Sequence, residues 1–495
     1  GYGLPGWMMH ARADHATQLT VLPSFIDQAF SRAAGVRRSE GNAVRVLNDA
    51  TENYPAWLDA IGAARRYIYF ESYILREDRS GSEFADALIA KARDGVVVRL
   101  VYDWLGCVGK APRRFWNALR NNGVEVRCYN PPRLDSPLGW LSRDHRKMLA
   151  VDGELAFVTG LCVGRMWRGD PARGIEPWRD TGVEIRGPAV AEVERAFARV
   201  WAMLGAPLPE PSPTPPAPAG NMDMRIVASE PATAGMLRLD LMIAALARKR
   251  LWITDAYYAG TASYVEALRA AARDGVDVRL LLPNATDLPL LQPLSRIGYR
   301  PLLEAGVRIF EWKGSMLHAK TAVADGHWAR VGSTNLNLAS WLGNCELDAV
   351  VENDAFGSAM EAMYLEDLAN ATEIVLDRRR RPRAPGGPRL SIQGLGAGAG
   401  GSKGSVSRAA AGAVRLGHTI GATFADRRLL GPIEARTATA TGVALIALSL
   451  LFALFPKALA YPLAGLGLWG GLVLLYRGGR LRAKRRALPA PEEEE

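Results

Sequence analysis

The sequence predicts an α/β fold made of two similar lobes, and three observations lead to this prediction. Runs rich in β-branched and aromatic residues alternate with alanine-rich runs of helical length. The alternation occurs twice, with the two copies separated by about 180 positions. A proline-rich stretch lies between the copies, and 495 residues are enough for two lobes with a large core.

The two copies match segment by segment. The segments of the first copy are AARRYIYFESYI at 63–74, ALIAKARDGVVVRLVYD at 87–103 and NGVEVRCY at 122–129. Those of the second copy are ARKRLWITDAYY at 247–258, ALRAAARDGVDVRLLLP at 267–283 and AGVRIFEW at 305–312. In both copies the alanine-rich run ends at Asp-Gly, where glycine suits the left-handed backbone of a helix end. Strands that alternate with helices predict an α/β sandwich around a largely buried sheet.

Changes of composition divide the chain into seven segments. In chain order we expect a helical N-terminal extension at 1–40, a first lobe at 41–205, a proline-rich linker at 206–222, a second lobe at 223–376, a basic, glycine-rich tether at 377–436, a transmembrane hairpin at 437–477 and a basic, then acidic tail at 478–495. Within the extension, residues 22–34 predict a helix. The linker has too much proline for helix or sheet, and the tether has too few apolar residues to form a core.

The hairpin is predicted from two apolar runs, Ala438–Phe455 and Ala458–Tyr476, which only Pro456 and Lys457 separate. At a rise of about 1.5 Å per residue, each run is just long enough to cross a hydrocarbon core of about 30 Å. A buried helical hairpin is the alternative, but no polar face interrupts either run. The runs therefore favour a membrane-spanning hairpin.

Charge indicates the kind of partner and the side of the membrane. The net charge of +10 favours an anionic partner, such as lipid headgroups, a membrane face or nucleic acid. Basic residues between Arg477 and Arg486 predict a cytoplasmic tail by the positive-inside rule. Because a two-pass hairpin returns to its starting side, we expect the lobes on the cytoplasmic side too. Residues 1–10 show no apolar run after a basic segment, so no export signal is expected.

Each copy also carries a histidine two residues before a lysine and seven residues before an aspartate. These residues are His145, Lys147 and Asp152 in the first copy and His318, Lys320 and Asp325 in the second. In a strand, residues two apart project to the same face, so each histidine and lysine can meet one anion together. Metal binding is disfavoured because a lysine cation repels a metal and because the four cysteines lack zinc-site spacing. We expect no metal and no other cofactor.

Two imidazoles and two ammonium groups at one point suit phosphodiester chemistry without a metal. One neutral histidine can attack phosphorus to form a covalent phosphohistidine, while the other, protonated, donates to the leaving alcohol. Lys147 and Lys320 would neutralise the charge that grows on the nonbridging oxygens. After the second motif, Gly332, Ser333 and Asn335 offer amide and hydroxyl groups to the same phosphate.

The second motif reads H-x-K-x4-D-x6-G-S-x-N from His318 to Asn335, and it resembles the HKD signature of the phospholipase D superfamily. Residues 41–376 are similar to bacterial cardiolipin synthases almost throughout. The similar stretches are YIYFESYI at 67–74, WRDTGVEIRGPAV at 178–190, DAYY at 255–258, SRIGYRPLLEAGVRIFEW at 295–312 and NCELD at 344–348. The resemblance implies a duplicated phospholipase D fold, in which both motifs meet across a pseudo-twofold axis and form one site.

The resemblance also implies roles for further residues. Two acids after the motifs, Asp180 and Glu346, would hydrogen-bond to the two imidazoles and orient them. The phosphate-binding residues would be Gly160, Ser333 and Asn335. The first copy departs from the pattern, because it has Cys162 where the second copy has Asn335. A thiol cannot donate as an amide does, so this half of the phosphate site is expected to be weaker or rearranged.

The function that the resemblance implies is phosphatidyl transfer of the cardiolipin synthase type. The chain would convert two molecules of phosphatidylglycerol into cardiolipin and glycerol, with His145 as nucleophile and His318 as acid. Its partners would be anionic phospholipid and the bacterial inner membrane, and no nucleic acid is expected. The alternatives are a phospholipase D that hydrolyses phospholipid to phosphatidic acid, a phosphatidylserine-type synthase, a nuclease, and a noncatalytic membrane scaffold of the same fold.

Overall fold

The computed structural model describes residues 25–133, 141–209, 214–285, 287, 296, 298–376 and isolated positions between 443 and 475. Described residues 25–129 and 143–376 belong to one compact unit, and positions 130–133, 141–142 and 443–475 belong to a second. The predicted tether, the predicted tail and most of the predicted hairpin lie outside the described residues. Within the part of the chain that is described, no helix has both the length and the hydropathy of a membrane span.

The strands form where the sequence has short β-branched and aromatic runs. In the first lobe they are β1 (Ser39–Asn48), β2 (Tyr67–Ser72), β3 (Val97–Asp103), β4 (Glu125–Tyr129), β5 (Lys147–Val151), β6 (Leu155–Thr159) and β7 (Thr181–Arg186). In the second lobe they are β8 (Met222–Ser229), β9 (Arg250–Thr254), β10 (Asp277–Pro283), β11 (Arg308–Trp312), β12 (Thr321–Ala324), β13 (Trp328–Gly332), β14 (Glu346–Glu352) and β15 (Ala371–Ile374). All of them belong to one 15-stranded sheet.

The order of the strands shows the duplication. The first lobe runs β4-β3-β2-β5-β6-β7-β1 from its edge to the centre of the sheet. The second lobe repeats this order as β11-β10-β9-β12-β13-β14-β8, with β15 added at its outer edge. In both lobes the first three strands of this order are parallel to one another. The fourth strand, β5 or β12, is antiparallel to the third, β2 or β9. The predicted α/β class and the internal duplication are confirmed.

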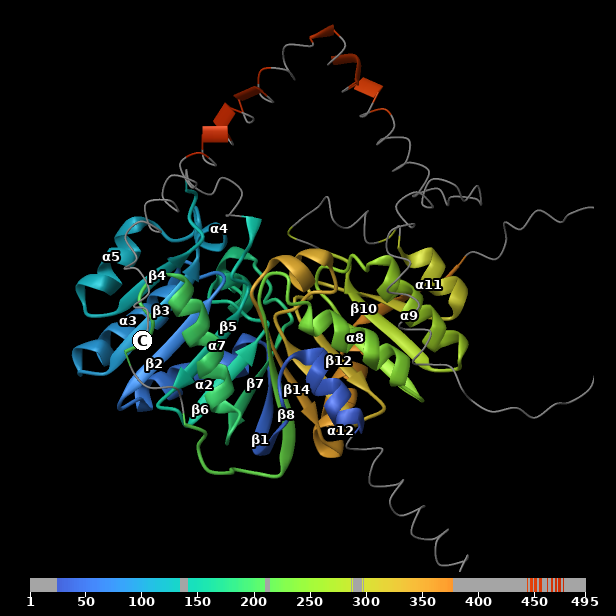
Figure 1. The fold of residues 1–495 in the computed structure, drawn as a ribbon, viewed down its shortest axis with the longest axis horizontal. Helices are drawn as coiled ribbons and strands as arrows, with labels where there is room; N and C mark the ends of the chain where they lie inside the picture. The colour runs from blue at the N-terminus through green and yellow to red at the C-terminus, as the bar shows by residue number, and fades with distance from the viewer. Residues whose placement is uncertain are drawn as a thin grey trace, which may run out of the picture. The chain divides into compact units, whose positions relative to one another are not determined.

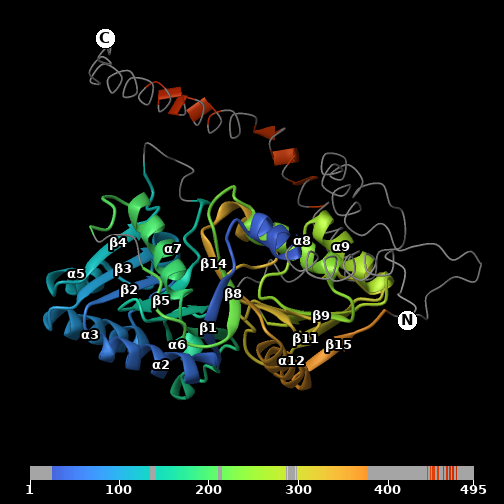
Figure 2. The ribbon, with the colours of Figure 1, turned by 60° about the horizontal axis from the view of Figure 1, so that its bottom comes forward.

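Helices cover both faces of the sheet (Figures 1 and 2). Those of the first lobe are α2 (Asp49–Ala63), α3 (Arg79–Arg93), α4 (Trp104–Cys107), α5 (Arg113–Asn121), α6 (Arg165–Arg168), η2 (Pro171–Arg173) and α7 (Val190–Met203). Those of the second lobe are α8 (Gly235–Leu246), α9 (Ala262–Arg273), α11 (Tyr299–Ala305), η3 (Ala339–Gly343) and α12 (Asp354–Ala369). The helices α2, α3 and α5 share one buried cluster with the first lobe, and α8, α9 and α11 share another with the second. Residues 25–34 are helical, as predicted.

The caps of two equivalent helices explain why they start and stop where they do. At the start of α3, the Asp78 carboxylate accepts hydrogen bonds from the amides of Ser80 and Gly81. At the start of α9, the Thr261 hydroxyl accepts one from the Tyr264 amide. Both helices end at an Asp-Gly pair whose glycine has a positive φ, +86° in the first lobe and +93° in the second. The predicted helix ends at Asp-Gly are confirmed.

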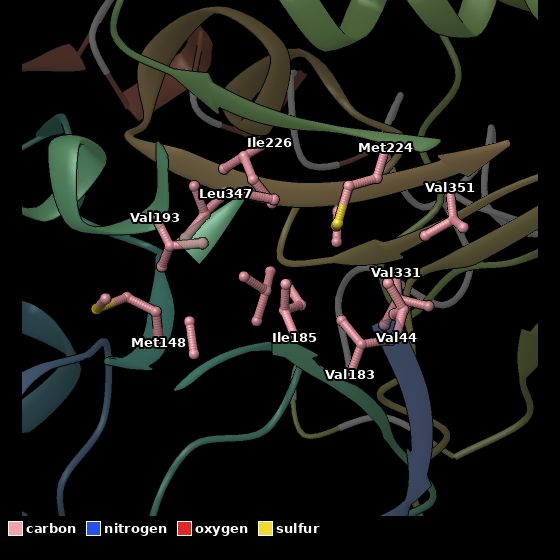
Figure 3. Close-up of a cluster of buried hydrophobic side chains, with 14 of the residues drawn as sticks. Val44, Met148, Val183, Ile185, Val193, Met224, Ile226, Val331, Leu347 and Val351 are labelled. Carbon is pink, nitrogen blue, oxygen red and sulfur yellow. The ribbon is translucent and has the colours of Figure 1, made fainter. Parts of the chain in front are cut away.

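The two lobes meet through a central core. Strands β1 and β8 pair at the middle of the sheet, and β13 and β14 pack against β6 and β7. Figure 3 shows Met224 and Ile226 of β8 and Leu347 of β14 near Val183 and Ile185 of β7. All five side chains are buried in one cluster, to which α7 and α12 also contribute. Because this apolar cluster joins the lobes, their facing edges are held together at the place where the two motifs lie.

Candidate active site

Each histidine-lysine motif is hydrogen-bonded to the opposite lobe through its backbone. His145 lies just before β5, and its amide donates to the Cys345 carbonyl at 2.9 Å. His318 lies just before β12, and its amide donates to the Arg179 carbonyl at 2.7 Å. Cys345 and Arg179 each directly precede one of the two acids predicted to orient the imidazoles. The backbone therefore places each histidine beside the acid of the other lobe.

Both imidazoles hydrogen-bond to a carboxylate through Nδ1. His145 Nδ1 lies 2.9 Å from Glu346 Oε2 and 3.1 Å from the Ser333 carbonyl oxygen. His318 Nδ1 lies 2.7 Å from Asp180 Oδ2. Each acid therefore contacts the histidine of the opposite lobe. The structure brings together the two histidines and the two acids that the sequence singled out, in crossed pairs.

The two acids are held in place by different neighbours. Glu346 accepts hydrogen bonds from the Ser333 hydroxyl at 2.5 Å and from Asn344 Nδ2 at 3.2 Å. Asp180 accepts a hydrogen bond from Trp167 Nε1 at 3.0 Å. An indole donor in one lobe thus takes the place that a hydroxyl donor takes in the other. The two halves of the site perform the same task with different residues.

Gly160 occupies the position in the first lobe that Ser333 occupies in the second. A β-carbon on Gly160 would lie 2.2 Å from Asp180 Oδ1, so only glycine fits beside this carboxylate. The amides of Gly160 and Ser333 each donate to a neighbouring strand carbonyl at 3.0 Å, and the Ser333 hydroxyl is bound to Glu346. The sequence led us to expect that these groups bind a phosphate. In the structure they are instead bound to neighbouring protein groups. Ser333 holds Glu346 by a hydrogen bond, and Gly160 leaves room for Asp180.

Asn335 and Cys162 occupy equivalent positions, and both side chains are buried. Asn335 Oδ1 has no hydrogen-bond partner within the described part of the chain, so it can accept a hydrogen bond from a ligand. Burial raises the pKa of the Cys162 thiol, although Lys147 and Lys320 lie close enough for their charges to oppose this rise. Cys162 is therefore a neutral thiol, and the amide side chain at this position comes from the second lobe alone.

Burial and charge determine the protonation states of the crossed pairs. The pKa of His318 falls to about 3, because the imidazole is buried and because the Lys320 cation lies beside it. Burial also lowers the pKa of His145. Burial alone would raise the pKa of Asp180 and Glu346, but the bound imidazoles hold both values below the usual range. Two neutral imidazoles thus donate from Nδ1 to two carboxylates, which leaves a lone pair on each Nε2.

Lys147 and Lys320 are almost completely buried beside the imidazoles. Each ammonium group donates to the carbonyl of the histidine two positions before it. Both cations lower the pKa of both imidazoles, so each lysine acts electrostatically on the histidines of both lobes. Burial lowers the pKa of Lys320 to about 8, which leaves it mostly protonated near neutral pH. Among the described residues, no group of three or more His, Cys, Asp and Glu side chains is placed to hold a metal ion.

Asp152 and Asp325 lie at the far ends of the motif strands, in the turns that follow β5 and β12. Asp152 accepts hydrogen bonds of 2.8 Å from the amides of residues 65–67, and Asp325 makes equivalent contacts with residues 248–250. Their φ angles of +56° and +53° match an Asp-Gly hairpin turn. Each aspartate is seven strand residues, roughly 20 Å, from its histidine. The catalytic role expected from the sequence is therefore corrected to a structural one.

Comparison with known proteins identifies the family. A family model described as cardiolipin synthase, PLD-like domain matches residues 57–201 and 242–368, which contain both motifs and both acids. The chain is 34% identical over 352 residues to cardiolipin synthase A of Pseudomonas aeruginosa, and the match covers 69% of this chain and 70% of that protein. The chain belongs to the cardiolipin synthase family.

Other comparisons agree with this membership of the cardiolipin synthase family. Cardiolipin synthase of Alkalihalophilus pseudofirmus is 32% identical over 343 residues, which is 68% of each chain. Cardiolipin synthase 2 of Bacillus anthracis is 33% identical over 349 residues, which is 68% of this chain and 67% of that protein. The crystal structure of phosphatidylserine synthase from Haemophilus influenzae Rd KW20 has the same fold, with a TM-score of 0.51 at 12% identity over 68% of this chain and 90% of that one. The phospholipase D-like fold and the family expected from the sequence are confirmed.

Four aromatic residues that enclose the histidines in this cardiolipin synthase family member were not predicted. The Tyr73 ring lies edge-on to the His145 imidazole, with 4.9 Å between the ring centroids. The Tyr257 ring lies edge-on to the His318 imidazole, with 5.9 Å between the centroids. The rings of Trp167 and Trp178 both lie 5.4 Å from the second imidazole. The tyrosines belong to the YIYFESYI and DAYY stretches, which the sequence marked as parts of the repeat and as similar to the family, without a role for either tyrosine. The tryptophans flank a loop whose position depends on the folded chain.

Proposed function

We propose that the chain transfers a phosphatidyl group from one phosphatidylglycerol molecule to a hydroxyl group of another, which produces cardiolipin and glycerol. The observation that carries this proposal is the crossed pairing of His145 with Glu346 and of His318 with Asp180. This pairing leaves two Nε2 atoms for one phosphate, as a double displacement at phosphorus requires. The family of the chain supports the substrate class.

In the first step, His145 Nε2 attacks the phosphorus of the donor lipid. A P–N bond forms, the P–O bond to the glycerol headgroup breaks, and His318 gives a proton to the leaving oxygen. His318 is neutral while the site is empty, because burial and Lys320 lower its pKa. An anionic phosphate between the lysines offsets their charge, raises this pKa and lets His318 hold the proton that it donates. The Glu346 carboxylate stabilises the positive charge on the phosphohistidine.

In the second step, a hydroxyl group of the acceptor lipid attacks the phosphohistidine. His318, now neutral, takes the proton of this hydroxyl, a new P–O bond forms, and the P–N bond to His145 breaks. One P–O bond has been exchanged for another, so the reaction needs no metal, nucleotide or net water. Water would compete with the acceptor hydroxyl, and the aromatic rings around the imidazoles reduce its access.

The lysines and Asn335 supply the rest of the phosphate site. Lys147 and Lys320 are placed to neutralise the nonbridging oxygens, where negative charge grows during transfer. The unpaired Oδ1 atom of Asn335 can accept a hydrogen bond from a glycerol hydroxyl. Cys162 has no carbonyl oxygen to accept an equivalent hydrogen bond. The second lobe would therefore orient the lipid whose hydroxyl attacks the phosphohistidine.

We also propose that the chain acts at the bacterial inner membrane, with its lobes on the cytoplasmic side. The two apolar runs at 438–455 and 458–476 and the basic residues after them support this location. The described large apolar side chains between positions 443 and 475, such as Leu454 and Leu475, are exposed and thus available to lipid. Protease treatment of inverted and right-side-out vesicles would distinguish this orientation from the opposite one.

The test of the proposed reaction is product analysis. The purified full chain would be incubated with vesicles of labelled phosphatidylglycerol, and the lipids would be identified by mass spectrometry. We expect cardiolipin and glycerol, and the variants His145→Ala and His318→Ala should abolish both products. His327→Ala is the matched control, because His327 is exposed and pairs with Asp354 away from the motifs. Phosphatidic acid as the sole product would identify a hydrolase, and the absence of any product would favour a noncatalytic scaffold.

A further inference from the structure

Two short helices, α4 and η3, contact or lie beside a contact to the backbone of the two tyrosines, Tyr73 and Tyr257, whose rings lie against the motif histidines. Helix α4 follows β3, and its Gly106 packs so tightly on the Tyr73 carbonyl that a β-carbon would lie 1.9 Å from this oxygen. Cys107 Sγ also accepts a hydrogen bond from the Leu75 amide at 3.3 Å. The Tyr73 ring in turn contacts the imidazole of His145. The buried side of α4 is therefore joined to the first half of the active site.

The helix η3 is linked to the second half of the active site, as α4 is to the first. It is a single π-helical turn that follows β13, and Asn337, two residues before its first residue, donates to the Tyr257 carbonyl at 3.0 Å. Asn337 Oδ1 also accepts a hydrogen bond from the Ser340 amide at 3.0 Å within η3. The Tyr257 ring contacts the imidazole of His318. Because β13 runs in the same direction as β9, η3 and Tyr257 lie at one edge of the sheet.

Both helices bury one side and expose large apolar side chains on the other. In α4, Cys107 is 2% exposed, and in η3, Trp341 is 1% exposed. The exposed side chains beside α4 are Leu105 at 36% and Val108 at 49%, and those beside η3 are Leu338 at 55% and Leu342 at 38%. Each lobe thus presents two aliphatic side chains at a short helix that is linked through one tyrosine to the catalytic histidine of the same lobe. We call these four residues the apolar rim.

We propose that the apolar rim inserts into the surface of an anionic phospholipid bilayer and delivers the active site to lipid phosphates. This inference rests on the proposed function, because a lipid phosphate lies at the boundary between headgroups and acyl chains. A site that reacts there must enter the headgroup layer, and aliphatic side chains beside the site gain free energy when they leave water. The net charge of +10 adds attraction to an anionic surface.

A second observation favours lipid over another copy of the chain as the occupant. The described apolar residues of the second unit, which include Val443, Leu454, Tyr461 and Leu475, are exposed as well. Exposed aliphatic residues therefore occur in both units of the chain. Burial in lipid accounts for the rim and for these residues of the second unit together, whereas a dimer through the rim would account for the four rim residues alone.

Fluorescence of a labelled rim residue tests contact with lipid independently of activity. A single environment-sensitive fluorophore on Leu338→Cys, in a full chain that also carries Cys128→Ser because Cys128 is a partly exposed free thiol, should shift to the blue in phosphatidylglycerol and phosphatidylcholine bilayers and be quenched by brominated acyl chains. Leu365→Cys is the matched control, because Leu365 is 48% exposed on α12 and should stay in water. Equal quenching at both positions, or none at Leu338, would overturn the proposal. A blue shift of the fluorescence that occurs without lipid and grows with protein concentration would also overturn the proposal, because it would indicate a dimer.

The second test compares two forms of the substrate. The double variants L105D/V108D and L338D/L342D should reduce the rate on phosphatidylglycerol vesicles by about tenfold or more, because charged side chains resist insertion. Their rate on monomeric short-chain phosphatidylglycerol should stay within about twofold of the unmodified chain, because the rim contains no catalytic group. Equal losses on both substrates, with an unchanged melting temperature, would contradict the inference. If the unmodified chain uses neither substrate, the proposed function fails, whereas the quenching result still stands.

Discussion

His145 Nδ1 lies 2.9 Å from Glu346 Oε2, although the two residues are 201 positions apart in the chain. The reciprocal contact joins His318 to Asp180 across 138 positions. Each lobe therefore supplies the acid that orients the histidine of the other lobe. A lobe on its own would have a histidine and an acid but no pair, which ties the chemistry to the interface between the lobes.

The crossed pairs predict large effects of isosteric changes at the acids. Glu346→Gln and Asp180→Asn should each lower the transfer rate by about 10²- to 10³-fold, because the amide cannot stabilise the imidazolium and no longer selects its tautomer. The rate would be measured on phosphatidylglycerol with the melting temperature of each variant. Glu266→Gln is the control, because Glu266 is exposed and pairs with Arg269 and Arg273 on its own helix. Rates near that of the control would contradict the role of the acids.

Substitutions at Gly160 and Ser333 should disturb the two orienting acids for different reasons, a clash at Gly160 and lost hydrogen bonds at Ser333. Gly160→Ala places a β-carbon 2.2 Å from Asp180 Oδ1, so it should displace this acid and destabilise the fold by about 1–3 kcal/mol. Ser333→Ala creates no clash, but it removes a hydroxyl that donates to Glu346 and accepts from the buried Leu347 amide, so we expect about tenfold lower activity and a loss of about 1–3 kcal/mol. Urea unfolding and rate measurements on both variants would check this. A stable, fully active Gly160→Ala variant would be inconsistent with the packing.

Asp152 should be essential for stability and dispensable for chemistry. Asp152→Ala removes a carboxylate that accepts three backbone hydrogen bonds and puts alanine at φ +56°, so we expect a loss of about 2–4 kcal/mol. Asp152→Asn tolerates this φ and keeps one acceptor, so its loss should be smaller. The rate per folded molecule should stay within about twofold in both variants. If Asp152→Asn folds fully but is inactive, the aspartate has a chemical role after all.

The pKa of His318 predicts how stability changes with pH. The folded chain holds this pKa at about 3, whereas an exposed histidine titrates near 6.5. Between about pH 6.5 and 3 the unfolded chain binds a proton that the folded chain does not, so the free energy of unfolding falls as the pH falls. His318→Gln should remove up to about 1.4 kcal/mol per pH unit of this dependence.

Urea unfolding at several pH values between about 7 and 5 would measure the slope. Asp180 and Glu346 contribute little in this range, because the bound imidazoles hold the pKa values of both carboxyl groups below their usual range. His327→Gln serves as the control, because His327 is more than half exposed. Parallel slopes for the unmodified chain and His318→Gln would refute the prediction.

Much of the fold could be predicted because it depends on local patterns. Alternating runs and Asp-Gly helix ends identified the strands and helices of both copies, and the repeat implied two equivalent lobes. The strand order of the sheet confirms this equivalence. The motif spacing also identified His145 and His318, since residues two apart in a strand share a face. These features need only the neighbours in the chain.

The roles within the site depended on contacts that no local pattern encodes. Asp152 has the spacing of a catalytic residue, yet the strand between it and His145 carries it to the opposite end of the hairpin. Ser333 looks like a phosphate ligand, but its hydroxyl is already bound to Glu346. Trp167 follows a loop of the first lobe and reaches Asp180 only in the folded chain.

Residue periodicity, the repeat and the motifs were thus sufficient to predict an α/β duplication with two histidine-lysine pairs, because they arise from interactions between near neighbours. Only the tertiary structure decided which acid serves which histidine, because His145 meets Glu346 and His318 meets Asp180 across the core that joins the lobes. Burial in that core also sets the charges of these groups. The same core turns two similar half-sites into one site with unequal halves.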